Sequence, residues 1–291
     1  MGRMMRLRRI AEGLKKSRIF CLMDWHAYID ESYDSNTFCV GGFMAPIDDW
    51  EKIELAWKQR LDYENRKSAE GGFPPISRYH ATDCANLKNE FNKQNGWNID
   101  RQIRLSKKLC GIIASNAPIG IVIGGTTEDF KRNFPAEEKD LKRVMYRFTF
   151  IMHLLVIADV MKQKFPDDRV TVYWDRSKEY GSIARAEFDG FVKNPEVKDL
   201  ARFFVTGAPL AWEDCVALQP ADLMAYEGFK RVSDVKSGKD LIRKSLEAML
   251  GKKTPITVAA YTDEVLKKLT RLVVEEQERE SALWHRAVCD D

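Results

Sequence analysis

Apolar runs and helically spaced apolar positions alternate along this chain. Runs typical of buried strands are found at 28–29, 38–43, 119–123, 169–174 and 201–205. Apolar residues that recur every three or four positions are found over about 48–67, 103–113, 136–165, 182–192 and 219–229. Strand and helix patterns that follow one another in this way predict an α/β protein with a mostly central sheet.

The first two apolar runs predict a hairpin. The pair at 28–29 leads directly into Asp30, Glu31 and Ser32, and the run at 38–43 follows after a short polar turn. A strand, a tight connection and a second strand are typical of this pattern. The acids therefore fall at the end of the first predicted strand, where side chains can converge on a site.

Two further acids fall at the ends of predicted elements. Asp175 ends the strand predicted at 169–174. Pro220 suits the first turn of a helix, which would place Asp222 in that turn, where the helix dipole favours an ionised carboxylate. Gln219 lies three residues before Asp222 and shares its helix face.

Because these ends can meet in a mostly central sheet, we predict that the acids form one metal-binding site. Carboxylates suit a hard ion such as Mg²⁺ or Mn²⁺, and two such ions about 3.5–4 Å apart can clamp a phosphodiester. The chain has neither a Cys-x-x-Cys pair nor a His-Glu-x-x-His motif, so structural zinc is not expected. Each acid alone could instead be an ordinary polar residue at the end of an element.

Two segments of the central region stand out. The stretch 136–165 is hydrophobic nearly all round, which predicts the most buried helix, with His153 as a packed core histidine. Residues 70–97 are rich in Gly, Pro and Asn, which predicts a long loop that holds His80. Loops of this length inside a compact domain are often functional or mobile.

We expect a main domain over residues 23–235, with a basic leader before it and a helical extension after it. The leader, 1–22, carries seven Lys and Arg residues against Glu12. It is interpreted as an arm for phosphate backbones or as a flexible leader, with Met23 as an alternative start. The extension, 236–291, is predicted to pack on the core as two charged helices split near Gly251 and Pro255. It is either a surface for a protein partner or second copy, or a solvated extension.

The composition indicates where the protein works but does not identify its substrate. The net charge of +3 does not by itself indicate nucleic-acid binding. No apolar run approaches the length needed to span a bilayer, and the apolar stretch after the leader is too short for a signal peptide. The six cysteines are scattered and are expected to be reduced. We therefore expect a soluble, cytoplasmic protein with no membrane partner.

Four short motifs, in this order along the chain, resemble the family called domain of unknown function 3800, which is placed with the ribonuclease H-like superfamily. The motifs are 28–32 with the Gly41-Gly42 pair, 80–83, 172–175 and 218–223, and they span about residues 26–230. The resemblance implies a ribonuclease H-like mixed central sheet flanked by helices. Tyr33 stands where the family signature has glycine, so we expect a narrower entrance to the site.

The resemblance also implies roles for the acids. Carried over by motif, Asp30 is the first-strand metal ligand, Asp175 the central-strand ligand and Asp222 the helix ligand. Glu31 matches the second acid of the family's pair, and it would be a fourth ligand or a base that orients water. Because adjacent strand residues point to opposite faces, Asp30 and Glu31 can both ligate only if the strand has ended by Glu31.

The predicted function is therefore that of a metal-dependent nuclease, a hydrolase that leaves a 5′-phosphate and a 3′-hydroxyl on RNA, DNA or a hybrid. His80, Gln219 and Ser32 are expected to contact the substrate, although a structural hydrogen bond is an equal interpretation of His80. Some relatives occur among mobile-element and antiphage-defence proteins, which suggests that context. A non-catalytic nucleic-acid-binding or regulatory scaffold of the same fold is the alternative, and an effector that needs a protein partner is a third hypothesis.

Overall fold

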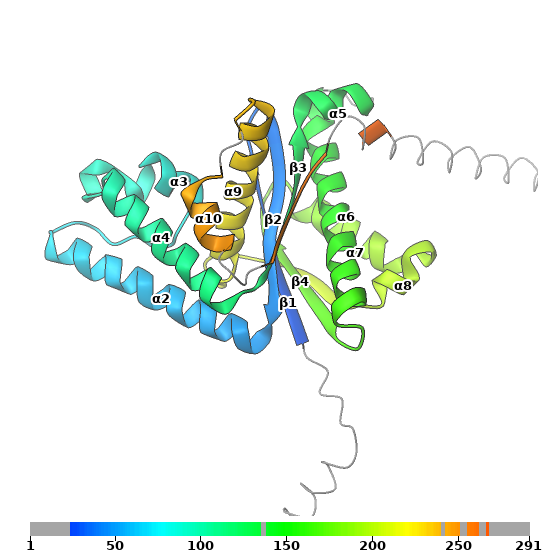
Figure 1. The fold of residues 1–291 in the computed structure, drawn as a ribbon, viewed down its shortest axis with the longest axis horizontal. Coiled ribbons are helices and arrows are strands. Elements are labelled where there is room, and N and C mark those ends of the chain that lie inside the picture. Colours follow the sequence, from blue (N-terminus) through cyan, green and yellow to red (C-terminus); the bar gives the residue numbers. More distant parts are fainter. Residues whose placement is uncertain (1–23, 135–137, 240–241, 251–254, 262–265, 268–291) are drawn as a thin grey trace, which may run out of the picture.

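A computed structural model describes residues 24–134, 138–239, 242–250, 255–261 and 266–267. These residues form an α/β structure in which a mixed six-stranded sheet has helices on both faces (Figure 1). The predicted α/β class, with a mixed central sheet flanked by helices, is confirmed. The predicted basic leader and most of the predicted C-terminal extension lie outside the described residues.

The sheet is a three-stranded meander extended by parallel strands on both sides. β1, β2 and β3 pair antiparallel, while β4 joins β1, β5 joins β4 and β6 joins β3 in parallel. In sheet order the strands are β5 (Phe204–Leu210), β4 (Arg169–Asp175), β1 (Asp24–Tyr33), β2 (Thr37–Pro46), β3 (Ile119–Thr126) and β6 (Ile256–Ala260).

The helices divide between the two faces of the sheet. One face carries α2 (Ile47–Glu70), α3 (Ala81–Asn86), α4 (Ile99–Asn116), α9 (Leu218–Lys236) and α10 (Lys244–Leu250). The other carries α5 (Thr127–Asn133), α6 (Glu138–Lys164), α7 (Gly181–Lys193) and α8 (Lys198–Ala201). Short 3₁₀ turns lie at Asn89–Phe91, Lys93–Asn95 and Pro195–Val197.

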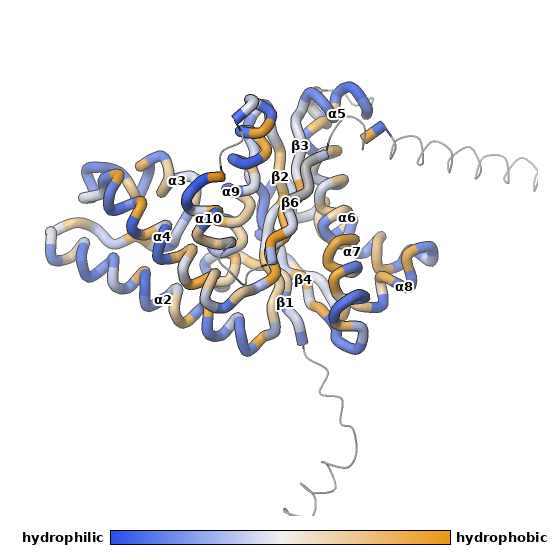
Figure 2. The backbone as a smooth tube through the Cα atoms, viewed as in Figure 1, coloured by the Kyte–Doolittle hydropathy of each residue, from blue (hydrophilic) through white to orange (hydrophobic). Residues whose placement is uncertain are grey.

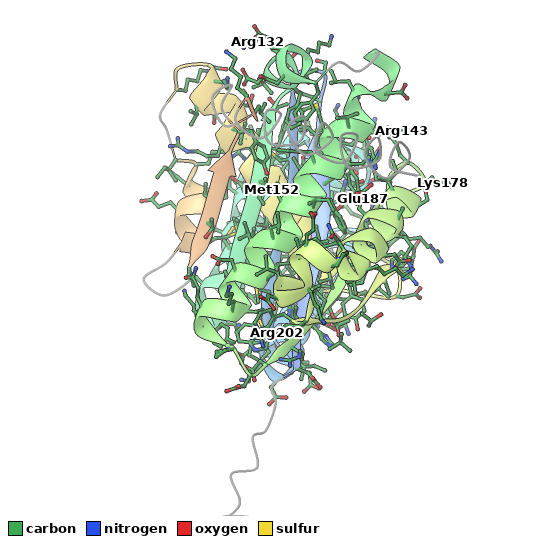
Figure 3. All side chains as sticks on the ribbon, turned by 90° about the vertical axis from the view of Figure 1, so that its right-hand side faces the viewer. Arg132, Arg143, Met152, Lys178, Glu187 and Arg202 are labelled. Carbon is green, nitrogen blue, oxygen red and sulfur yellow. The ribbon has the colours of Figure 1, made fainter. Side chains whose placement is uncertain are left out.

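Each face of the sheet has its own hydrophobic core. Along β1, Ala27 and Ile29 join the core under α6, whereas Tyr28 joins the core under α9, as strand alternation requires. Apolar segments gather toward the sheet and polar ones toward the outside (Figure 2). Figure 3 shows the α6 face, where the labelled Arg143 and Glu187 belong to α6 and α7.

The structure corrects three predictions about elements. The segment 70–97, predicted as a loop, contains the helix α3 and two 3₁₀ turns. β5 lies at Phe204–Leu210 rather than 201–205, because an edge strand tolerates Pro209, which had indicated a loop. The C-terminal extension is not wholly helical, since residues 256–260 form β6. The β-branched run Ile256-Thr257-Val258 after a proline favours a strand there.

One helix meets the length and composition of a membrane span, although the sequence had indicated none. It covers Asp140–Lys164 within α6, and half of its most apolar stretch is buried. Met145, Phe150 and Leu154 are fully buried in the core beneath the sheet. This is the placement of a core helix, which is how the apolar stretch was interpreted from the sequence.

His153 is a core histidine, as predicted. It is 1% exposed on α6, and its ring hydrogen-bonds the backbone of Val40 on β2. Burial lowers the pKa of His153 to about 3, because the charged imidazolium would lose its hydration inside the core. The folded protein therefore keeps this ring neutral at any pH near neutrality.

This pKa predicts an acid-dependent loss of stability. Between pH 6.5 and 3 the unfolded chain binds a proton at His153 that the folded chain does not, so this residue lowers the stability as pH falls through that window. Relative to His153→Gln, which cannot titrate, wild type should lose about 2 kcal/mol of unfolding free energy between pH 8 and pH 5. Urea unfolding at both pH values measures this difference, and equal pH dependence in the two proteins would contradict it.

α9 lies unusually close to the sheet at Gly41. A Cβ built on Gly41 would lie 2.6 Å from the Cα of Ala225 and 2.7 Å from its backbone nitrogen, closer than real side chains come. At the next turn of α9, a Cβ on Gly228 would lie 2.2 Å from a methyl group of Val122 on β3. Glycine on the sheet and glycine on the helix therefore set the distance between the two layers.

A methyl group at Gly41 should push α9 away from the sheet. Because the atoms that it would meet are backbone atoms, Gly41→Ala is expected to lower the free energy of unfolding by about 1–3 kcal/mol. Gly190→Ala is the matched control, since its new Cβ would meet nothing within 4 Å in the interior of α7. The control should gain about 0.5–1 kcal/mol. Equal stability changes in urea unfolding would show that Gly41 does not limit the packing.

Candidate functional site

β1 and β4 bring Asp30 and Asp175 together. The two strands run parallel with Ile29 opposite Trp174, so Asp30 and Asp175 are neighbours at the next position of the register. Two residues earlier, on the same face, the rings of Tyr28 and Tyr173 stack with centroids 5.1 Å apart. This stacked pair holds β1 and β4 in register next to the two carboxylates.

α9 adds Asp222 from above the same face. Its Oδ2 accepts a hydrogen bond of 2.7 Å from the backbone N–H of Ala81, at the start of α3. α9 begins at Leu218, not at Pro220, so Asp222 lies beyond the first turn. Desolvation raises the pKa of Asp222, opposed by the charges of His80 and Arg78. The prediction that Asp222 lies in the first turn of this helix is therefore wrong, and its burial outweighs the effect of the helix dipole that was expected there.

Six of the seven predicted site residues line one cavity of about 180 Å³: Asp30, Glu31, His80, Asp175, Gln219 and Asp222. Ser32 does not line the cavity, although it shares a strand face with Asp30. Tyr33, expected to narrow the entrance, also lines the cavity, and its hydroxyl donates a 2.9 Å hydrogen bond to Glu179.

The acids destabilise one another's ionised forms. The pKa of Asp30 is raised well above its ordinary value by desolvation and then by the charges of Glu31, Asp222 and Asp175. Desolvation raises the pKa of Asp175 as well, and the nearby Arg78 opposes that rise. Such a cluster is stabilised by a proton or by a cation, and carboxylate clusters with perturbed pKa values are typical of functional sites.

Glu31 does not lie on the same side of β1 as Asp30, as it would if the strand had ended before it. β1 continues to Tyr33, so the side chains of Asp30 and Glu31 leave opposite faces of the strand. Glu31 reaches the cavity beyond the last residue of β4, where Ser177 hydrogen-bonds its carboxylate. Desolvation and the charge of Asp175 raise the pKa of Glu31 to about 8.

Gln219 is held by the protein itself. Its buried Oε1 accepts hydrogen bonds from Trp57 Nε1 at 3.1 Å and from the backbone N–H of Tyr79 at 2.9 Å. The amide oxygen therefore fixes the loop that carries Arg78 and His80. Its role in this geometry is to position that loop, rather than to meet the substrate through this oxygen.

Five residues that line the cavity were not predicted as site residues, and two of them, Arg78 and Trp212, bear on its chemistry. The guanidinium of Arg78 lies 4.1 Å from the centroid of the Trp212 ring, which holds a cation at the mouth of the acidic cluster. The two residues are far apart in sequence, and the only signal was that Arg78 precedes His80. On the same loop, Nδ1 of His80 lies 2.8 Å from Oδ2 of Asp83.

The donor set fits a hard divalent cation by its chemistry. Carboxylate oxygens, without a thiolate or a histidine cluster, are the ligands that Mg²⁺ and Mn²⁺ prefer. Across the part of the chain that the structure describes, no three acidic, histidine or cysteine side chains already stand in a ligand geometry. The charges of neighbouring acids contribute to the raised pKa of Asp30, and a bound cation would relieve this repulsion.

Comparison with known proteins adds no assignment to this geometry. No family model matches the chain, and no curated protein matches its sequence.

Proposed function

We propose that the chain is a metal-dependent nuclease of ribonuclease H-like fold that hydrolyses phosphodiester bonds in RNA or DNA. The observation that carries the proposal is the convergence of Asp30, Asp175 and Asp222 in one cavity on one face of the sheet. The first strand, an adjacent parallel strand and a later helix supply these acids. This is the arrangement that the family resemblance implies.

The acids have separate parts in the proposed reaction. Asp30, Asp175 and Asp222 would hold Mg²⁺ or Mn²⁺. Because β1 continues past Glu31, this acid would take the other role predicted for it, a base that orients water, rather than that of a fourth ligand. Bound there, such an ion supplies Lewis-acid polarisation of the phosphate and makes a water molecule more acidic. Because the pKa of Glu31 is about 8, its carboxyl group can take up or release a proton near neutral pH.

The loop residues provide the contacts to the phosphate. Arg78 is held against Trp212 at the cavity, and a guanidinium binds phosphate oxygens through directed hydrogen bonds. His80 is partly exposed beside Asp222 and would meet the substrate next to Arg78. The family resemblance suggests antiphage defence or a mobile element as the context of this activity. Composition suggests a cytoplasmic location, and the charged C-terminal extension suggests a protein partner or a second copy.

Asp175→Asn is expected to abolish cleavage without unfolding the protein. Loss of one metal-holding charge should lower the cleavage rate by about 100-fold or more. Desolvation raises the pKa of Asp175, so its ionised form costs folding free energy and the neutral amide should not lower the melting temperature. The assay uses single-stranded RNA, single- and double-stranded DNA and RNA–DNA hybrid, each with Mg²⁺, Mn²⁺ or chelator.

Asp167→Asn is the matched control, because this exposed acid lies just before β4 and away from the cavity. It should cut at the wild-type rate. Cleavage that survives in Asp175→Asn, or that persists in chelator, would remove Asp175 or the metal from the mechanism. Nucleic-acid binding without cleavage on any substrate would favour the alternative of a non-catalytic scaffold.

A further inference from the structure

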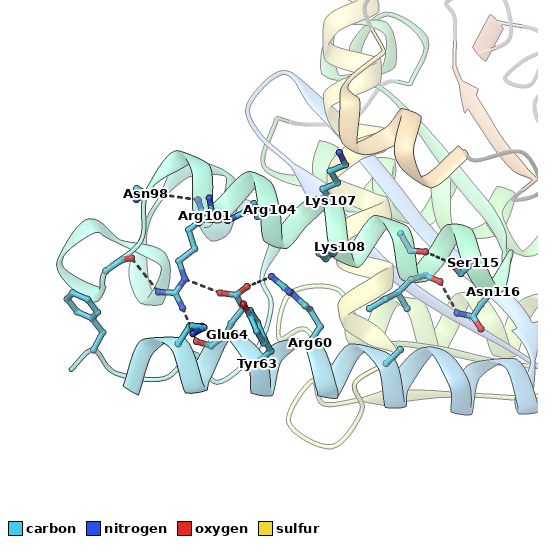
Figure 4. A pocket seen from close by; sticks show the side chains of 16 residues that line it. Arg60, Tyr63, Glu64, Asn98, Arg101, Arg104, Lys107, Lys108, Ser115 and Asn116 are labelled. Atoms are coloured by element: carbon cyan, nitrogen blue, oxygen red, sulfur yellow. Dashed lines mark hydrogen bonds and ion pairs between the residues drawn. The ribbon is translucent and has the colours of Figure 1, made fainter. Parts of the chain in front are cut away.

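A second, larger cavity lies away from the acids. It is a groove of about 1030 Å³ between α2 and α4, on the same face of the sheet as α9 (Figures 1 and 4). Six lysines and arginines line it, against the single acid Glu64. A concave surface with such an excess of one charge attracts ligands of the opposite charge.

Half of these cations already have a carboxylate partner within the protein. Glu64 is 3% exposed and accepts hydrogen bonds from Arg60 and from Arg101, whose Nε lies 3.0 Å away (Figure 4). Lys67 pairs with Glu70 at 2.6 Å. These paired residues form the walls of the groove, and we do not assign ligand binding to them.

The remaining three cations lie on α4 and are available to a ligand. Arg104, Lys107 and Lys108 are exposed, and none of them has a carboxylate partner among the residues that the structure describes. Arg104 and Lys108 are one helical turn apart and share a side of α4. Exposed cations in a row, without carboxylate partners, are suited to a chain of phosphates, each of which carries one negative charge.

The same groove exposes two aromatic rings. Tyr63 is 42% exposed and Phe73 is 39% exposed, and only Tyr33 among the other described aromatic residues is comparably exposed. The guanidinium of Arg60 lies 4.7 Å from the centroid of the Tyr63 ring. Aromatic faces beside a basic track are what unpaired bases stack on, whereas a duplex keeps its bases stacked on one another.

A short segment of chain joins the groove to the acidic cavity. Phe73 lines the groove and Arg78 lines the cavity, and five residues of chain span at most about 18 Å. The segment that joins them is anchored by Asn65 on α2, which exchanges two hydrogen bonds with the backbone of Ile76. A strand that lay in the groove could therefore enter the cavity within a few nucleotides.

We propose that the groove between α2 and α4 binds single-stranded nucleic acid. Arg104, Lys107 and Lys108 hold its phosphates, and Tyr63 and Phe73 stack on its bases. The proposal that the groove binds a single strand depends only on the residues of the groove. The further proposal, that this strand is the substrate cleaved in the cavity, rests on the proposed function. RNA and DNA both offer phosphates and bases to these residues, so the experiment tests both.

The test measures fluorescence anisotropy of labelled single-stranded RNA, single-stranded DNA and duplex DNA in chelator, so that no cleavage occurs. The variant R104Q/K107Q/K108Q should bind single strands at least about 10-fold more weakly, with a salt dependence shallower by about two. The matched control R143Q/K162Q/K164Q removes the same residue types from exposed positions of α6 on the opposite face. It should bind like wild type.

The rings are tested separately with Y63L/F73L, which keeps apolar bulk and all charges. It should weaken single-strand binding by about 5-fold or more and leave duplex binding unchanged. Absence of wild-type binding, or equal loss in the α6 control, would overturn the groove assignment. Equal binding of duplex and single strand, unaffected by Y63L/F73L, would show a general polyanion surface and overturn the single-strand assignment.

Cleavage separates this inference from the proposed function. Asp175→Asn should retain groove binding, because it lies outside the groove. Groove-dependent binding with no cleavage on any substrate would refute the nuclease and support the groove. Cleavage with no effect of R104Q/K107Q/K108Q on either binding or rate would refute the groove and support the nuclease. The nucleic acid that binds more strongly, RNA or DNA, is then the one that the groove prefers.

Discussion

The contact between Gly41 and Ala225 sets the geometry on which the candidate site depends. Gly41 is paired with Asp30 across the first hairpin, and Asp222 lies one turn before Ala225 on α9. The spacing of sheet and helix at this contact therefore limits how far Asp222 can stand from Asp30. A larger side chain on either element would separate them before any change in the acids themselves.

That close packing places the acids where water solvates them poorly. Desolvation is the largest cause of the raised pKa of Asp30, Glu31, Asp175 and Asp222 alike. Ionised carboxylates in such a place cost folding free energy, which the two hydrophobic cores must offset. Because apolar residues at these positions would be more stable, the cluster is better explained by a ligand that needs it than by stability.

The sequence was sufficient for the parts of the structure that local pattern determines. Asp30 and Asp175 could be placed together because both end apolar strands, and strand ends meet at a sheet edge. Long-range packing determined what the sequence could not show: β6 pairs with β3 across more than a hundred residues, and Trp212 meets Arg78 only in the folded chain. Burial likewise decided the pKa of Asp222, which position within a helix alone could not reveal.

One amide group joins the two surfaces to which we assign function. Through a single oxygen, Gln219 binds Trp57 on α2, which forms one wall of the groove, and the backbone of Tyr79, beside Arg78 in the cavity. Gln219 itself lies three residues before Asp222 on α9. A buried acceptor with two donors is costly to leave unpaired, so the groove helix, the phosphate-facing loop and the ligand-bearing helix are held in one arrangement. Both candidate surfaces therefore lie on the α9 side of the sheet and share this one anchoring residue.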